Sequence, residues 1–122
     1  MITLSKTFTI EAAHYLPERP NPHGHSYEVE VWVKGDENSD YVIGEAKFDQ
    51  KASAVVSQLD HRVLNDVIPV PTTENIARWI WNNLESELSL FKVVVRRPTI
   101  KMACEYYGGN YGIRGYAFTQ PK

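Results

Sequence analysis

Three of the four histidines lie close together along the chain and could bind a metal ion. His23 and His25 are separated only by Gly24, so on a strand both imidazoles project to the same side. His14 continues the alternating apolar pattern of the preceding segment, and an antiparallel hairpin would bring it beside the other two. Three neutral imidazoles leave one tetrahedral position open, as in catalytic zinc sites. The spacing therefore predicts a zinc site; the alternative is that these histidines only form hydrogen bonds in the hairpin.

A second candidate for chemistry is the adjacent pair Asp60 and His61. A carboxylate beside an imidazole can fix the tautomer of the ring and raise its basicity, which suits a residue that transfers protons near neutral pH. The alternative is a helix end at which both side chains face water. The pair alone does not decide between these two roles.

The run Thr72, Thr73, Glu74 and Asn75 follows two prolines and is typical of the first turn of a helix. Free backbone amides and hydroxyl groups in such a turn could bind a polar ligand. An ordinary helix cap explains the same residues equally well. Both interpretations stay open at this point.

Two strands are predicted in the first half of the chain, over residues 8–14 and 27–33, because apolar residues occupy every second position there. His23 and His25 share the apolar parity of the second strand. Residues 17–22 contain three prolines, each without an amide donor, and they predict an irregular connection that breaks the strands.

The second half of the chain mixes helical and strand patterns. Its predicted elements are a helix over 49–60, a helix that follows the 72–75 cap, strands over 93–95 and 100–106, a turn at 108–110 and a short strand over 116–118. The only cysteine, Cys104, alternates with apolar residues and is interpreted as a buried structural residue. This order predicts an α+β fold with the helices on one face of a sheet.

Composition limits the classes of protein to which the chain can belong. Its 122 residues predict a single domain over 1–122. The net charge of −2 provides no electrostatic attraction for nucleic acid or an anionic membrane, and no apolar run reaches the length of a transmembrane helix. The single cysteine fits a reducing compartment. We therefore expect a cytoplasmic protein with neither a nucleic-acid nor a membrane partner.

Four motifs, in their order and spacing, resemble the 6-pyruvoyltetrahydropterin synthase / 6-carboxytetrahydropterin synthase family. The motifs are FTIEAAH at 8–14, HGH at 23–25, LDHRVLN at 59–65 and TTEN at 72–75. The resemblance spans about residues 5–107, and every histidine of the chain falls on a position that the family uses. It implies the tunnelling fold, which is a four-stranded antiparallel sheet with two helices on one face. Subunits of this fold form a trimeric β-barrel, and two trimers stack into a hexamer.

The resemblance also implies roles for particular residues. It assigns zinc binding to His14, His23 and His25, and it places Asp60 and His61 in a catalytic group within a pocket shared between subunits. The residues at 72–74 and Glu105 are then candidates for substrate binding.

Two positions depart from the family pattern. Arg19 stands where the 6-carboxytetrahydropterin synthases carry their catalytic cysteine. A branch of the family that cleaves dihydroneopterin uses a glutamate in that loop, which makes Glu18 the candidate base. Pro98 stands where the family holds the pterin ring with a glutamate, and Glu105 is the carboxylate that could replace it.

The function implied by the resemblance is that of a zinc-dependent lyase. Its substrate would be a dihydropterin such as dihydroneopterin triphosphate, as for a 6-carboxytetrahydropterin synthase in queuosine or pterin/folate biosynthesis. The alternative is a protein without turnover that keeps the fold and the zinc and binds a pterin-like or purine-like ligand. Arg19 and Pro98 favour this alternative.

Overall fold

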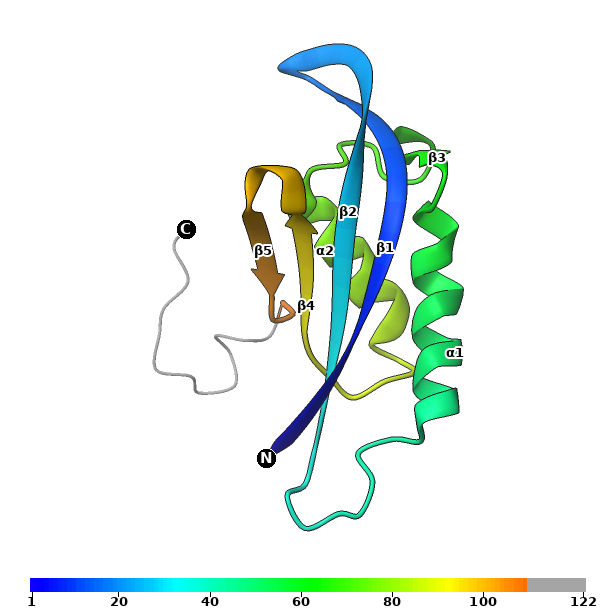
Figure 1. The fold of residues 1–122 in the computed structure, drawn as a ribbon, viewed down its shortest axis with the longest axis vertical. Coiled ribbons are helices and arrows are strands. Elements are labelled where there is room, and N and C mark those ends of the chain that lie inside the picture. The colour runs from blue at the N-terminus through cyan, green and yellow to red at the C-terminus, as the bar shows by residue number, and fades with distance from the viewer. Residues whose placement is uncertain (110–122) are drawn as a thin grey trace.

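A five-stranded sheet with two helices against one face makes up the computed structural model, which describes residues 1–109 (Figure 1). The strands are β1 (Ile2–Leu16), β2 (Arg19–Gly35), β3 (Arg62–Val63), β4 (Leu90–Arg97) and β5 (Met102–Tyr106), and the helices are α1 (Glu45–Val56) and α2 (Thr73–Leu84). Short 3₁₀ turns lie at Ser57–Leu59, Leu64–Asp66 and Pro98–Ile100. The predicted strand over 116–118 and the end of the predicted turn at 108–110 fall outside the described residues.

The order of the strands across the sheet is β3-β1-β2-β4-β5. The pairs β1–β2, β2–β4 and β4–β5 are antiparallel, which matches the four antiparallel strands that were predicted. The fifth strand, β3, is parallel to β1 and pairs only with Ala12 and Ala13. A two-residue strand has no alternation to detect in a sequence, so it was not predicted. The α+β fold itself is confirmed.

The long hairpin of β1 and β2 runs past the positions where the prolines were predicted to break it. β1 ends at Leu16 and β2 begins at Arg19, so only two residues form the turn. Pro20 and Pro22 lie inside β2, and the predicted irregular connection over 17–22 is therefore wrong. β4 pairs with β2 only from Glu28 onward. Among residues 1–109, the prolines lie where β2 pairs with β1 alone, and strands tolerate proline at such an edge.

The core lies between the sheet and the helices. Over residues 10–14 of β1 and 27–33 of β2 every second side chain is buried there, which confirms the predicted alternation. The buried residues of β2 are Tyr27, Val29, Val31 and Val33, and those of α2 are Ile76, Ala77, Ile80 and Leu84. This packing fixes which face of the hairpin looks toward the helices.

Helix α1 begins at Glu45, four residues before the predicted start, and ends at Val56. Gly44 precedes it in extended conformation, and Phe48 is the first buried side chain of its apolar stripe. The 3₁₀ turn Ser57–Leu59 continues the chain to Asp60, which is extended. Each helix has 12 residues, and within residues 1–109 no helix is long and apolar enough to cross a membrane.

After β5 the chain passes closely over a tryptophan of α2. The rings of Trp81 and Tyr106 lie edge to face with centroids 5.7 Å apart. Gly108 has φ +86°, and a Cβ atom built on it would lie 2.4 Å from Trp81 Cζ2. Glycine is therefore required at this position by both conformation and space.

We expect Gly108→Ala to lower the free energy of unfolding by about 1–3 kcal/mol, because the added methyl group must displace the indole. Urea denaturation measures the effect. Gly109→Ala is the matched control, since its Cβ would lie 3.7 Å from the Tyr106 hydroxyl, which is ordinary contact. Equal unfolding midpoints for the two variants would contradict the close approach.

Candidate metal centre

Three imidazoles meet at one end of the β1–β2 hairpin, on the face of the sheet that carries the core. His14 pairs with His23 across the hairpin, and His25 lies opposite Ala12. One ring nitrogen from each histidine lies within 4.8 Å of the others. His14 is buried, whereas His23 and His25 are half-buried. The cluster therefore has a closed side toward the core and a side that a ligand can reach.

Backbone carbonyls fix the orientation of two of these rings. His14 Nδ1 lies 2.9 Å from the Pro71 carbonyl oxygen, and His23 Nδ1 lies 3.0 Å from that of Asn21. A carbonyl oxygen only accepts hydrogen bonds, so each Nδ1 carries a hydrogen and each Nε2 has a free lone pair. Such a bond from the outer ring nitrogen is the usual support of a metal-binding histidine.

The two free lone pairs face each other, since His14 Nε2 and His23 Nε2 are 3.0 Å apart. Two lone pairs at this separation repel unless a cation lies between them. Zinc binds imidazole nitrogen at about 2.0–2.1 Å, so two ligands on a tetrahedral ion are roughly 3.3 Å apart. The donor set and its spacing fit a zinc ion with three nitrogen ligands.

The environment favours the neutral form of His14 and of His25. Burial, and then the Arg97 guanidinium, lower the pKa of His25 to about 4. Burial is also the main cause that lowers the pKa of His14. Metal ions bind neutral imidazole, so these shifts leave the ring nitrogens ready for a metal at neutral pH.

The start of α2 supports the cluster from behind. Thr72 caps the helix, because its hydroxyl oxygen accepts from the Asn75 amide at 3.1 Å. Thr73 donates to the Glu74 carboxylate at 3.0 Å. The structure shows the cap, and substrate binding by Thr72, Thr73 and Glu74 stays a prediction. The same turn presents the Pro71 carbonyl to His14, a contact that the sequence analysis missed because no local pattern marks it.

Asn65 holds the strand next to His14. Its side-chain amide accepts from the Tyr15 amide at 3.0 Å and donates to the Tyr15 carbonyl at 2.9 Å. This pair of bonds joins the 3₁₀ turn Leu64–Asp66 to β1 one residue after His14. The sequence analysis quoted Asn65 only as part of a motif, and its neighbours in the chain do not reveal the contact.

The Asp60 carboxylate and the His61 ring are in contact at the edge of the sheet. Asp60 Oδ2 lies 3.0 Å from His61 Nδ1, and Asp60 Oδ1 accepts from the Glu11 amide at 2.8 Å. The His61 amide donates to the Glu11 carbonyl at 2.6 Å, and His61 has φ +57°. The His61 side chain is 78% exposed. The Asp60 carboxylate and the His61 amide thus attach the pair to the backbone of β1, while the His61 ring is exposed to solvent.

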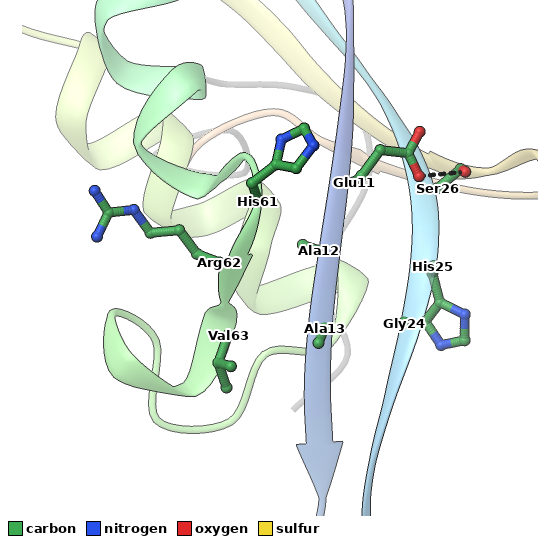
Figure 2. Close-up of a pocket in the computed structure, with 9 residues that line it drawn as sticks. All are labelled: Glu11, Ala12, Ala13, Gly24, His25, Ser26, His61, Arg62 and Val63. Atoms are coloured by element: carbon green, nitrogen blue, oxygen red, sulfur yellow. Dashed lines mark hydrogen bonds between the residues drawn. The ribbon is translucent and has the colours of Figure 1, made fainter.

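Within one chain, His61 does not lie beside the three imidazoles. His61 borders β1, and His25 lies on β2 beyond it, so two strand spacings separate them, or roughly 10 Å. A cleft of about 540 Å³ includes both, with walls formed by Glu11, Ala12, Ala13, Gly24, His25, Ser26, His61, Arg62 and Val63. Figure 2 shows Glu11 and Ser26 joined by a hydrogen bond of 2.6 Å, whereas His25 projects away from them.

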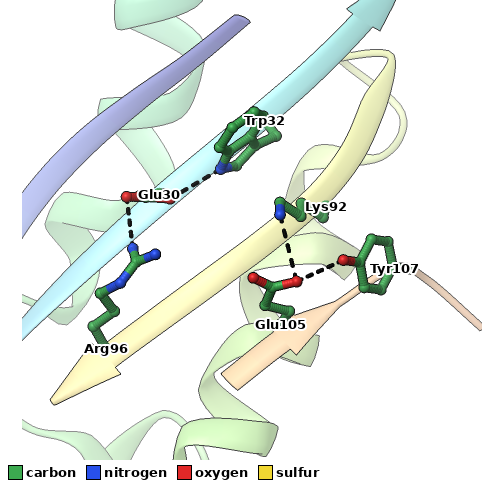
Figure 3. Close-up of polar contacts among 6 residues, drawn as sticks. All are labelled: Glu30, Trp32, Lys92, Arg96, Glu105 and Tyr107. Atoms are coloured by element: carbon green, nitrogen blue, oxygen red, sulfur yellow. Dashed lines mark hydrogen bonds and ion pairs between the residues drawn. The ribbon is translucent and has the colours of Figure 1, made fainter. Parts of the chain in front are cut away.

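The remaining predicted site residues lie at some distance from the three imidazoles. Glu18 is exposed in the two-residue turn beyond the end of β1, and it is two residues past Leu16. Glu105 pairs with Val94 on the face opposite the core and contacts Lys92 at 3.4 Å and the Tyr107 hydroxyl at 2.5 Å (Figure 3). The structure therefore does not bring Glu105 to the cluster.

Cys104 lies half-buried against the core. Burial, and then the Glu74 carboxylate, raise the pKa of its thiol. A thiol in this state is a poor nucleophile, which agrees with the structural role that was predicted.

Residues 3–109 match the family model described as 6-pyruvoyl tetrahydropterin synthase. The chain belongs to this family. The resemblance of its four motifs is thereby confirmed. A solved 6-pyruvoyl tetrahydropterin synthase from Caenorhabditis elegans superimposes with a TM-score of 0.76 at 26% identity, covering 88% of this chain and 96% of that chain.

Relatives of this family member in two archaea bear the names of enzymes that process pterins. A dihydroneopterin monophosphate aldolase of Pyrococcus furiosus is 39% identical over 82 residues, which cover 66% of this chain and 72% of that protein. A putative 6-carboxy-5,6,7,8-tetrahydropterin synthase of Archaeoglobus fulgidus is 34% identical over 109 residues, covering 84% of this chain and 92% of that protein.

We expect the stability of this family member to fall in acid partly because of Asp60. The backbone hydrogen bond from Glu11, and then His61, hold the pKa of Asp60 below its ordinary value. A carboxyl group with a lowered folded pKa stabilises the protein above its unfolded pKa of about 3.9, and this contribution is lost as the pH falls through the folded pKa. Asp60→Asn does not titrate, so its thermal midpoint should fall less steeply with decreasing pH.

Thermal melting of both proteins between neutral pH and about pH 2 gives the thermal midpoint as a function of pH, and the slopes of the two curves are compared. Asp40→Asn, which removes an exposed carboxylate before α1, controls for the change in net charge. Identical pH profiles for the parent and Asp60→Asn would show that the ionisation of Asp60 contributes nothing to the pH dependence of stability.

Proposed function

We propose that the chain is a zinc-dependent lyase that acts on a dihydropterin. The observation that carries this proposal is the facing pair of Nε2 atoms in His14 and His23, 3.0 Å apart, with both outer nitrogens held by carbonyls. The names of the archaeal relatives, an aldolase and a synthase for pterins, support the substrate class.

His14, His23 and His25 would hold the zinc ion, and the carbonyls of Pro71 and Asn21 keep two of the rings in the binding tautomer. When bound, zinc supplies a Lewis acid that polarises a substrate oxygen and acidifies the adjacent carbon. The core behind His14 excludes water from one side of the site.

The Asp60–His61 pair is the proposed proton carrier. Asp60 accepts from His61 Nδ1, so Nε2 of the same ring is free to take a proton from the substrate and return it. Glu18 is the second candidate base, because its carboxylate is the only acidic group in the turn between the two strands.

We also propose a homo-oligomer, a hexamer formed from two trimeric barrels. β3 covers only Ala12 and Ala13 of β1, so most of that long strand has an open edge within the described residues, and β5 forms the opposite edge of the sheet. Open edges are commonly covered by pairing between subunits. A second copy could then bring its His61 to the imidazoles of the first, across the gap of roughly 10 Å within one chain.

We expect one zinc ion per chain, because the three imidazoles form a single site. His23→Ala should lose the metal after dialysis against a weak chelator, whereas His61→Ala, which removes the one histidine outside the cluster, should retain it. Elemental analysis measures the zinc. Equal zinc content in the two variants would refute the assignment.

We expect the protein to convert dihydroneopterin triphosphate or monophosphate into a product. Chromatography of the reaction mixture measures the rate. His61→Ala and Glu18→Gln should each lower kcat by about 10²- to 10⁴-fold, the usual effect of losing a general base, while leaving the zinc in place. Unchanged rates in both variants would place the base elsewhere.

Mixing the inactive His23→Ala and His61→Ala chains tests the shared site. Part of the activity should return after joint refolding, because one chain supplies the imidazoles and another supplies His61. A parent protein that binds dihydroneopterin without forming any product would favour the ligand-binding alternative. Arg19, in the position of the family cysteine, and Pro98, in the position of the glutamate that holds the pterin, favour this alternative.

A further inference from the structure

The ring of Tyr27 contacts two of the three imidazoles. Tyr27 follows His25 by two residues on β2, so both side chains project to the same face of the sheet. The centroid of its ring lies 5.9 Å from that of His25 and 6.3 Å from that of His14, with interplanar angles of 86° and 83°. These are edge-to-face contacts, a preferred arrangement of neighbouring aromatic rings. The Tyr27 ring is therefore a common support for both imidazoles.

Tyr27 is itself enclosed on both sides. It is 1% exposed, and its neighbour across the hairpin is the buried Ile10. On the other side, the pairing of Glu28 with Arg96 places Arg97 next to it. The Arg97 guanidinium carbon lies 5.7 Å from the centroid of the Tyr27 ring, within the range of a cation–π contact. A side chain packed in this way has little room to move, so its position is passed on to the rings that it contacts.

His25 depends on this support more than the other two histidines do. Backbone carbonyls hold Nδ1 of His14 and Nδ1 of His23. The ring of His25, by contrast, forms no hydrogen bond within residues 1–109, and its ring contacts there are with the other two imidazoles and with Tyr27. A metal ligand that rotates freely must lose that freedom on binding, which weakens the affinity for the metal. The Tyr27 contact thus takes the place of the carbonyl that His25 lacks.

We infer that Tyr27 is a positioning residue of the metal centre, whose ring fixes the imidazole of His25 and helps to hold that of His14. The ring does this rather than the hydroxyl group. The Tyr27 hydroxyl oxygen lies 3.4 Å from His14 Nδ1, whereas the Pro71 carbonyl oxygen lies 2.9 Å from the same nitrogen. The inference rests on the zinc site of the proposed function, and it adds to that site a residue outside the ligand set.

The first test measures the zinc affinity of the full chain by competition with a chromophoric chelator, well below the thermal midpoint of each variant. Tyr27→Leu removes the ring and should weaken zinc binding by about 10- to 100-fold, the usual effect of losing a group that orients a metal ligand. Tyr27→Phe keeps the ring and should bind zinc within about threefold of the parent, because only a long hydrogen bond is lost. If Tyr27→Leu does not fold, Tyr27→Met takes its place, since its unbranched side chain fills irregular space.

Val29→Ala is the matched control for a general loosening of the core. Val29 is buried on the same face of β2, two residues beyond Tyr27 and four beyond His25. Its truncation should lower the thermal midpoint, as Tyr27→Leu does, and leave the zinc affinity unchanged. Equal losses of zinc affinity in Val29→Ala and Tyr27→Leu would overturn the positioning role, because core packing alone would then explain both.

A second measurement, on the metal-free protein, separates this role from the proposed function. NMR relaxation of the imidazole C–H groups reports the motion of each ring on the ps–ns timescale. In Tyr27→Leu the His25 ring should become more mobile, whereas the His23 ring, which has no ring contact with Tyr27 within residues 1–109, should keep its mobility. Unchanged motion of the His25 ring overturns the positioning role. A parent that binds no zinc contradicts the proposed function, and the motion of the His25 ring still decides the role of Tyr27.

Discussion

The pairing register of β1 and β2 is the constraint on which the candidate site depends. It sets His14 opposite His23 and His25 opposite Ala12, so that three imidazoles meet at one end of the hairpin. The register is anchored by the buried pair Ile10 and Tyr27 in the core. A slip of one residue would turn every side chain of one strand to the other face. The three imidazoles and the core are thus fixed by the same packing.

The same alternation gives the two faces of the sheet different chemistry. Toward the helices, the strands carry the apolar core and, at its end, the imidazoles. On the opposite face, Glu30 binds Arg96, and Lys92 lies between Glu105 and the Trp32 ring, 4.6 Å from the ring centroid. Two adjacent residues of β4 therefore lie in different surroundings. Arg96 pairs with a carboxylate, and Arg97 lies on the face that carries the imidazoles.

The site also depends on backbone groups that come from distant parts of the chain. The Pro71 carbonyl orients His14 from 57 residues away, and Asn65 fixes the strand at Tyr15. The helix cap at Thr72 holds this turn in place, so the start of α2 supports both the helix and the imidazole. The imidazole cluster is complete within one chain, whereas the Asp60–His61 pair lies at a sheet edge that a second copy could reach.

The sequence alone determined the features that follow from local periodicity. Alternation on two strands predicted the shared face of His14, His23 and His25, and the apolar stripes predicted two helices on one side of a sheet. It could not predict the features that depend on distant neighbours. Proline is tolerated in β2 because β4 pairs only farther along, and Glu105 is turned from the cluster by its pairing with β4. The tertiary structure also decided the tautomer of His14 and the position of Arg97, because hydrogen bonds and charges act between residues that are remote in the chain.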